Sequence, residues 1–218
     1  QNATSGQVIC RHQNLMQVPV TERRALGIGR TFQVAQVFEA LTVIQNLQLV
    51  LKAKTGVSAL DTLDDADHDA ALAWAQTMGL EKLGLEALHA SAAHLSYGNK
   101  KRLELAMAMA GLPHPSKALL LLDEPAAGLS PDERFDMMAR IRKLTAQGTT
   151  VLYTEHNMDA VKGVADRVLV LGGTPTRVAG TLDIDLPRPR DPDDPATLPL
   201  LRAVRDLLRR ADIPAGVG

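Results

Sequence analysis

Hydrophobic residues change their spacing along the chain, and each spacing predicts a different kind of element. Residues 118–123 (ALLLLD) are almost continuously apolar, which is typical of a parallel strand covered on both faces. Two further apolar runs, 149–154 and 167–171, alternate with helical patterns at 131–147 and 157–164. This β-α-β-α-β order predicts a doubly wound α/β sheet with right-handed crossovers.

Before this core, the pattern predicts two short strands followed by a helical region. The strands are expected at 6–10 and 27–33, and in the second of these Ile28 and Phe32 stand at even spacing, as in a half-buried strand. From about residue 41 to residue 93 the apolar positions recur every three or four residues, which predicts helices.

After the core, residues 176–185 predict a short hairpin, and the proline-rich residues 187–195 (PRPRDPDDP) predict a stiff, extended linker. A last amphipathic helix is expected, and its apolar stripe consists of Leu200, Leu201, Val204, Leu207 and Leu208.

Composition narrows the class of protein. A chain of 218 residues that is 45% hydrophobic and 22% charged can bury a sizeable core, which excludes disordered and collagen-like chains. The formal net charge of -1 gives no overall positive excess for binding nucleic acid or an anionic membrane. Cys10 is the only cysteine, so an internal disulfide framework is excluded.

Two adjacent carboxylates follow the most apolar run, in residues 119–125 (LLLLDEP). Asp123 and Glu124 would stand at the carboxyl end of a buried strand, where open α/β sheets bind ligands. In a nucleotide hydrolase the first acid would hold Mg²⁺ and the second would polarise the attacking water. Taken alone, the motif is equally compatible with a simple turn before Pro125.

A second motif, residues 95–106 (LSYGNKKRLELA), begins a predicted helix. Free backbone N–H groups, the small Gly98 and the hydroxyl of Ser96 would together form an anion site suited to phosphate. Ordinary helix capping by Ser96 explains the same residues, and the two interpretations are compatible.

In this order and separation, the two motifs resemble the signature sequence and Walker B motif of ABC transporter nucleotide-binding subunits. Residues 127–133 (AGLSPDE) are similar to the D-loop of that family, 154–158 (TEHNM) to the switch-histidine segment and 30–33 (RTFQ) to the Q-loop. The resemblance covers roughly residues 6–171, and within the family the motifs are most similar to those of branched-chain amino acid importers.

The resemblance implies an α/β P-loop NTPase fold with a helical subdomain, using ATP and Mg²⁺. It also implies an organisation in four parts. These are the start of the catalytic core up to the Q-loop (1–40), the helical subdomain (41–95), the remaining core with signature, Walker B, D-loop and switch histidine (96–185), and a linker with a C-terminal helix (186–218).

Residue roles follow from the same resemblance. Gln33 would contact Mg²⁺ or the attacking water and couple the site to a membrane subunit, and Asp123 would support Mg²⁺. Glu124 would be the general base, and His156 would sense the γ-phosphate. The ATP site of the opposing subunit would be completed by Ser96, Tyr97, Gly98, Asn99 and Ser130.

The implied partners are a second ATP-binding subunit and transmembrane permease subunits, and nucleic acid is not among them. The implied location is peripheral, at the cytoplasmic face of the cell membrane. The implied function is to energise an importer by ATP hydrolysis.

The sequence also departs from the family pattern. Asn99 stands where Gln or Glu is usual, Tyr97 where Gly is frequent and Ser130 where many relatives have Asp. The Walker A pattern G-x-x-x-x-G-K-[ST] occurs nowhere in the 218 residues. We therefore expect a chain truncated at its N-terminus, without the strand–P-loop–helix unit, that binds ATP weakly or not at all and has an open sheet edge.

Three alternatives to a branched-chain importer ATPase each share some of these features. Residues 181–195 resemble the C-terminal segment of nitrate, sulfonate or taurine importer ATPases, which favours a different solute. A DNA-repair or chromosome-organising ATPase shares two motifs, but sustained heptads are absent between Gln33 and Leu95. A catalytically dead module would not be expected to keep both Glu124 and His156.

Overall fold

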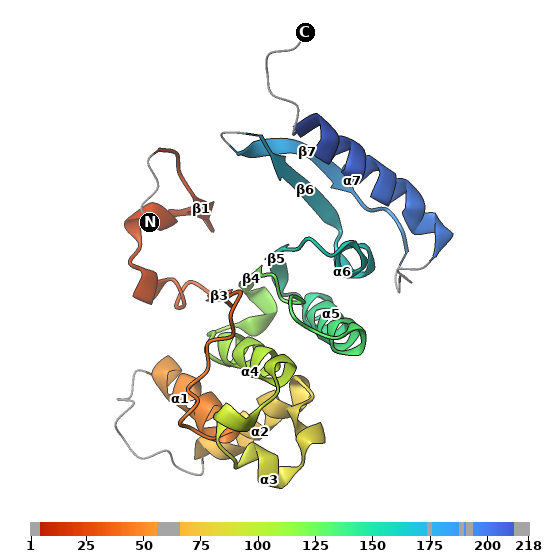
Figure 1. The fold of residues 1–218 in the computed structure, drawn as a ribbon. Coiled ribbons are helices and arrows are strands. Elements are labelled where there is room, and N and C mark those ends of the chain that lie inside the picture. The colour runs from red at the N-terminus through yellow and green to blue at the C-terminus, as the bar shows by residue number, and fades with distance from the viewer. Residues whose placement is uncertain (1–4, 56–65, 174–175, 188–189, 191–193, 212–218) are drawn as a thin grey trace.

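A parallel three-stranded sheet lies at the centre of the molecule (Figure 1). The computed structural model describes residues 5–55, 66–173, 176–187, 190 and 194–211. The sheet has the order β3-β4-β5 and consists of β3 (Ile28–Arg30), β4 (Leu119–Asp123) and β5 (Thr150–Thr154). The parallel strand predicted here is confirmed, with β4 pairing to a strand on each side. It is not fully covered on both faces as predicted, because only Leu120 and Leu122 are buried and the alternate residues are partly exposed.

Helix α5 (Pro131–Ala146) follows β4 and has well-defined signals at both ends. Its N-terminus carries a capping box, in which the Ser130 side chain accepts from the Glu133 N–H and the Glu133 carboxylate accepts from the Ser130 N–H. Beyond its C-terminus Gly148 has a φ of 99°, and a Cβ there would stand 2.5 Å from the Ser116 carbonyl oxygen. The predicted helix and its glycine stop are therefore confirmed.

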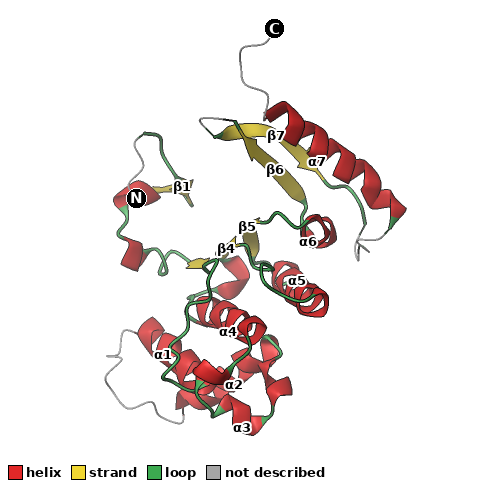
Figure 2. Cartoon of the chain, viewed as in Figure 1, coloured by secondary structure: helices red, strands yellow, loops and turns green. Residues whose placement is uncertain are grey.

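The helical region forms a compact group beside the sheet (Figure 2). It contains α1 (Val43–Thr55), α2 (Ala66–Thr77) and α3 (Leu85–Leu88), as the three- and four-residue spacing predicts. The helix predicted from the second motif, α4 (Tyr97–Ala110), contacts α1 and α2. One continuous hydrophobic core joins these helices to the sheet; among its fully buried members are Ile44, Leu47, Met78, Leu103, Met109, Leu120 and Ile141.

The prediction for residues 167–171 is wrong in one respect, because this strand does not join the parallel sheet. Helix α6 (Met158–Val164) leads into β6 (Arg167–Gly172), which pairs antiparallel with β7 (Arg177–Asp183) in a separate sheet. A short connection allows β6 to pair with the strand that follows it, so the hairpin expected within 176–185 is instead formed by β6 and β7. The third parallel strand is β3, which precedes the helical region.

The predicted C-terminal helix is present as α7 (Leu198–Ala211) and covers this hairpin (Figure 1). Val204 is buried, and a Cβ at Gly180 of β7 would lie 2.6 Å from a methyl carbon of Leu207. Most of the predicted linker lies outside the described residues. Of the linker residues that are described, Arg190 donates to the carbonyl oxygens of Leu186 and Ile184.

The N-terminal strands are shorter than predicted. β1 (Ile9–Cys10) pairs antiparallel with β2 (Gln13–Asn14), and Phe32 lies beyond the end of β3 with 44% of its surface exposed. Phe32 is therefore not half-buried within a strand as expected, because the buried positions are Gly29 and Thr31. Single 3₁₀ turns lie at Leu15–Gln17, Val20–Glu22, Leu80–Leu83, Ala92–His94, Pro115–Lys117 and Pro195–Thr197.

Within the described ranges, β3 and β5 are the two edge strands of this sheet. Leu152 of β5 and two leucines of β6, Leu169 and Leu171, are about half exposed. In the part of the chain that the structure describes, no helix is both long and apolar enough to cross a bilayer.

Candidate active site

The two carboxylates of the LLLLDEP motif stand at the carboxyl end of the central strand, as predicted. Asp123 is the last residue of β4 and lies opposite Thr154, the last residue of β5. The Thr154 hydroxyl donates to Asp123 Oδ1 at 2.8 Å, and the Glu124 N–H lies 3.2 Å from the same hydroxyl oxygen. Thr154 is not among the predicted site residues. Its place at the end of a predicted strand, directly before Glu155 and His156, could have indicated that it belongs to the site.

Three residues predicted to be catalytic meet at the Glu124 carboxylate. The Gln33 side-chain N–H donates to Glu124 Oε2 at 3.0 Å, and His156 Nδ1 lies 3.5 Å from Glu124 Oε1. The Glu124 side chain is 27% exposed, whereas that of His156 is 73% exposed. A carboxylate that is partly shielded but reachable from solvent is suited to accept a proton from water.

Glu124 adopts a backbone conformation that is unusual for a residue with a side chain. Its φ is 46°, in the left-handed region, which costs about 1–3 kcal/mol for a residue other than glycine. This conformation turns the chain sharply after β4. As a result, the Glu124 side chain does not follow the alternating directions of the side chains in β4. Its carboxylate points towards Gln33 and His156 instead.

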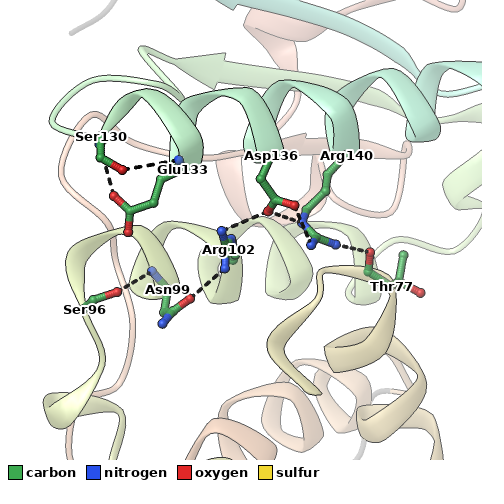
Figure 3. Close-up of polar contacts among 8 residues, drawn as sticks. All are labelled: Thr77, Ser96, Asn99, Arg102, Ser130, Glu133, Asp136 and Arg140. Carbon is green, nitrogen blue, oxygen red and sulfur yellow. Dashed lines mark hydrogen bonds and ion pairs between the residues drawn. The ribbon is translucent and has the colours of Figure 1, made fainter. Parts of the chain in front are cut away.

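The signature residues form a second group where the N-terminal ends of α4 and α5 meet (Figure 3). The Ser96 hydroxyl accepts from the Asn99 N–H at 3.3 Å, so the capping interpretation of Ser96 is confirmed. The Asn99 side-chain oxygen accepts from Arg102 at 3.0 Å, and its side chain is thereby turned along its own helix. Ser130 caps α5 next to this group.

Two glycines allow these helix ends to approach closely. A Cβ at Gly98 would stand 2.5 Å from Glu133 Oε1, and Gly128, with a φ of 73°, faces the Tyr97 ring. The Tyr97 hydroxyl donates to the Gln33 carbonyl oxygen at 2.9 Å, so the signature segment directly contacts the Q-loop of its own chain. Burial raises the pKa of the Tyr97 hydroxyl, and the charge of Glu104 adds to this effect.

A buried carboxylate that was not predicted holds the Q-loop. Glu104 of α4 accepts from the N–H groups of Phe32 and Gln36, both at 3.1 Å. Burial raises the pKa of Glu104, whereas these two hydrogen bonds and the charge of Lys101 lower it. The available signal was a charged residue between two leucines, Leu103 and Leu105, in a predicted helix.

The residues that could hold a metal are few. Asp123 offers a carboxylate and Gln33 a side-chain carbonyl, and no group of three or more His, Cys, Asp or Glu residues suited to a metal occurs among the described residues. Mg²⁺ typically takes one or two carboxylates and completes its octahedron with water and substrate phosphates. The residues present therefore fit a magnesium–phosphate complex better than a bare cation.

The sequence profile of the ABC transporter family matches residues 1–127. The chain belongs to the ABC transporter family. LivG of Escherichia coli K12, a high-affinity branched-chain amino acid transport ATP-binding protein, is 33% identical over 198 residues, covering 83% of this chain and 74% of LivG. BraF of Pseudomonas aeruginosa, which has the same description, is 30% identical over the same coverage. The lipopolysaccharide export ATP-binding protein LptB of Escherichia coli K12 is 31% identical over 182 residues, covering 80% of this chain and 70% of LptB.

Solved structures support the predicted fold for this ABC ATPase subunit. A nucleotide-free ATP-binding cassette of an ABC transporter superposes with a TM-score of 0.63 at 23% identity, covering 78% of this chain and 67% of that chain. A second cassette, in its ADP conformation, gives a TM-score of 0.62 at 24% identity over 78% of this chain and 66% of that one. The predicted P-loop NTPase fold of the ABC type is thus confirmed.

Proposed function

We propose that this ABC ATPase subunit hydrolyses ATP to drive the import of branched-chain amino acids. The observation that carries the proposal is the Glu124 carboxylate, held between Gln33 and His156 and directly after Asp123. The similarity to LivG and BraF supports the choice of solute. Proximity and orientation of a general base account for much of the rate in such sites.

Each residue of the site has a proposed task. Glu124 accepts the proton of the attacking water, and Gln33 orients both that water and the carboxylate it already contacts. Asp123, kept in place by the Thr154 hydroxyl, is the proposed protein ligand of Mg²⁺. His156 stands beside Glu124 and is proposed to hydrogen-bond the terminal phosphate. Bound Mg²⁺ would neutralise the charge that develops as the phosphoryl group is transferred.

The phosphate-binding part of the site is incomplete in these 218 residues, which lack the Walker A pattern. We therefore propose that these 218 residues alone bind ATP weakly or not at all. Titration with a fluorescent ATP analogue tests this directly. Binding weaker than the millimolar range supports it, and micromolar binding contradicts it.

Two kinds of partner are proposed. The residues Ser96, Tyr97, Gly98, Asn99 and Ser130, at the facing ends of α4 and α5, are proposed to contact ATP held by a second subunit. The exposed apolar side chains of Phe32, Val34 and Phe38 around the Q-loop are proposed to face a permease at the cytoplasmic side of the membrane. Residues 181–195 support a second candidate solute, of the nitrate, sulfonate or taurine type.

Transport by the assembled system distinguishes these solutes. The protein that contains these 218 residues is assembled with its permease partners in lipid vesicles, and ATP-driven accumulation of labelled leucine, taurine and nitrate is measured. We expect leucine to accumulate and the other two solutes to remain at background. Accumulation of taurine or nitrate instead of leucine would contradict the proposed solute.

A further inference from the structure

Lys101 is a buried lysine whose ammonium group contacts the segment that carries Glu124. It lies on the core-facing side of α4 and is only 3% exposed. Its Nζ donates to the main-chain carbonyl oxygen of Glu124 at 3.0 Å and stands 5.6 Å from the centre of the Tyr97 ring. Three residues further along the same helix, Glu104 holds the Q-loop. One turn of α4 therefore contacts both segments that form the site.

Burying an ammonium group is costly unless strong partners compensate for the lost water. Burial lowers the pKa of Lys101, and the opposing attraction comes from the carboxylates of Glu104, Glu155, Glu124 and Asp123. The lysine therefore lies among several carboxylates, of which Glu104 on its own helix contributes most and Glu155, Glu124 and Asp123 contribute less. A buried donor of this kind is expected to hold its acceptor in a defined direction.

The acceptor is the main-chain carbonyl of the residue with the strained backbone. The Glu124 N–H donates to Thr154, and the Glu124 carbonyl oxygen accepts from Lys101 Nζ at 3.0 Å and from the Ala127 N–H at 3.1 Å. With both of its main-chain polar groups bonded, the left-handed conformation at φ 46° is kept. That conformation directs the carboxylate to Gln33 and His156.

We propose that Lys101 is a positioning residue for Glu124, holding the main chain of Glu124 in the conformation that presents its carboxylate for catalysis. Lys101 does not touch the reacting groups in this arrangement and acts only through Glu124. The catalytic consequence rests on the proposed function, whereas the structural consequence does not. The two consequences can therefore be measured separately.

The neighbouring Lys100 provides a matched control. It lies on the same helix and pairs with the exposed Glu39 at 2.5 Å, away from Glu124. The variants are Lys101→Met, which keeps the length of the side chain without its donor, Lys101→Arg, which keeps charge and donor, and Lys100→Met. For each full chain, amide hydrogen exchange of Glu124 and the side-chain NH₂ resonances of Gln33 are followed by NMR.

Loss of a charge-assisted hydrogen bond in Lys101→Met should raise the exchange rate of the Glu124 amide by about tenfold or more and shift the Gln33 NH₂ resonances. Lys101→Arg and Lys100→Met should leave both readouts unchanged, and amides within α4 and β4 should keep their protection in all variants. The proposal is overturned if Lys101→Met leaves Glu124 unchanged, if Lys101→Arg behaves like Lys101→Met, or if protection falls throughout α4 and β4.

Activity is measured in parallel in the assembled transporter. Lys101→Met should lower kcat for ATP hydrolysis by about tenfold or more with KM for ATP within about twofold of the unaltered protein, since the ground-state contacts to ATP are not changed. An unchanged kcat would overturn the proposal. If the unaltered transporter hydrolyses no ATP, the proposed function fails, and the exchange results alone decide the role of Lys101.

Discussion

At the scale of single residues, the site depends on buried charges and close contacts that no short motif contains. Glu104 and Lys101 lie one turn apart on α4, and each binds main-chain groups of a different active-site segment. A sequence pattern could identify Gln33 and Glu124 by their motifs. It could not show that both motifs are held by the same helix, because this requires the long-range contacts of α4 with β3 and with Glu124 after β4.

Glu104 makes a prediction about pH. Because burial raises its pKa, the folded chain binds its proton more tightly than the unfolded chain does. Its contribution to stability is therefore greatest below the ordinary glutamate pKa and falls as the pH rises through that value towards the raised one. Urea unfolding at several pH values should show this decline in the unaltered chain and a smaller decline in Glu104→Gln. An equal decline in both proteins would contradict this assignment.

Gly98 makes a prediction about packing. In Gly98→Ala the new methyl group would meet Glu133, whose carboxylate belongs to the capping box of α5, and should cost about 1 kcal/mol of unfolding free energy. The loss should be smaller when the same substitution is made in a Glu133→Ala background, because the obstructing carboxylate is then absent. Equal losses in both backgrounds, measured by urea unfolding, would show that the strain arises elsewhere.

At the scale of elements, an ion pair as well as apolar contacts holds α4 and α5 together. Asp136 of α5 contacts Arg102 of α4 at 2.9 Å and Arg140 of its own helix at 2.8 Å, and Arg140 donates to the Thr77 carbonyl oxygen (Figure 3). Burial alone would raise the pKa of Asp136, but the hydrogen bond from Arg140 and the charges of Arg140 and Arg102 hold it below its usual value.

Asp136→Asn should therefore destabilise the chain by about 1–3 kcal/mol at neutral pH, since two half-buried arginines lose their shared carboxylate. A carboxyl with a lowered pKa contributes its full stability above the ordinary aspartate pKa and loses it as the pH falls towards the lowered value. The stabilities of the two proteins should thus converge in acid. A constant difference from neutral pH down to about pH 2, measured by chemical unfolding, would contradict this.

Most elements near the site could be predicted from spacing alone, because each has strong local signals. The run of leucines in β4, the capping box of α5 and the glycine after its end act within a few residues. The pairing of β6 could not be predicted in this way. An apolar strand can join a parallel sheet or a hairpin, and only the position of its neighbours decides between the two.

At the scale of the whole molecule, the residues proposed for hydrolysis lie together, whereas the Walker A pattern is absent from the 218 residues. The five segments that resemble ABC motifs, and their order, could be found in the sequence because each is short and local. The convergence of Gln33, Glu124 and His156 from three separate segments became visible only in the folded chain. We therefore propose Glu124 as the general base at the centre of this group.

Steady-state ATP hydrolysis by the assembled transporter tests that claim most directly. Glu124→Gln keeps the size of the side chain but removes the proton acceptor, so we expect hydrolysis to fall by about 10²–10⁴-fold. The matched variant Glu86→Gln, on the exposed side of α3, should hydrolyse ATP as the unaltered protein does. A Glu124→Gln transporter that hydrolyses ATP at the unaltered rate would contradict the central claim.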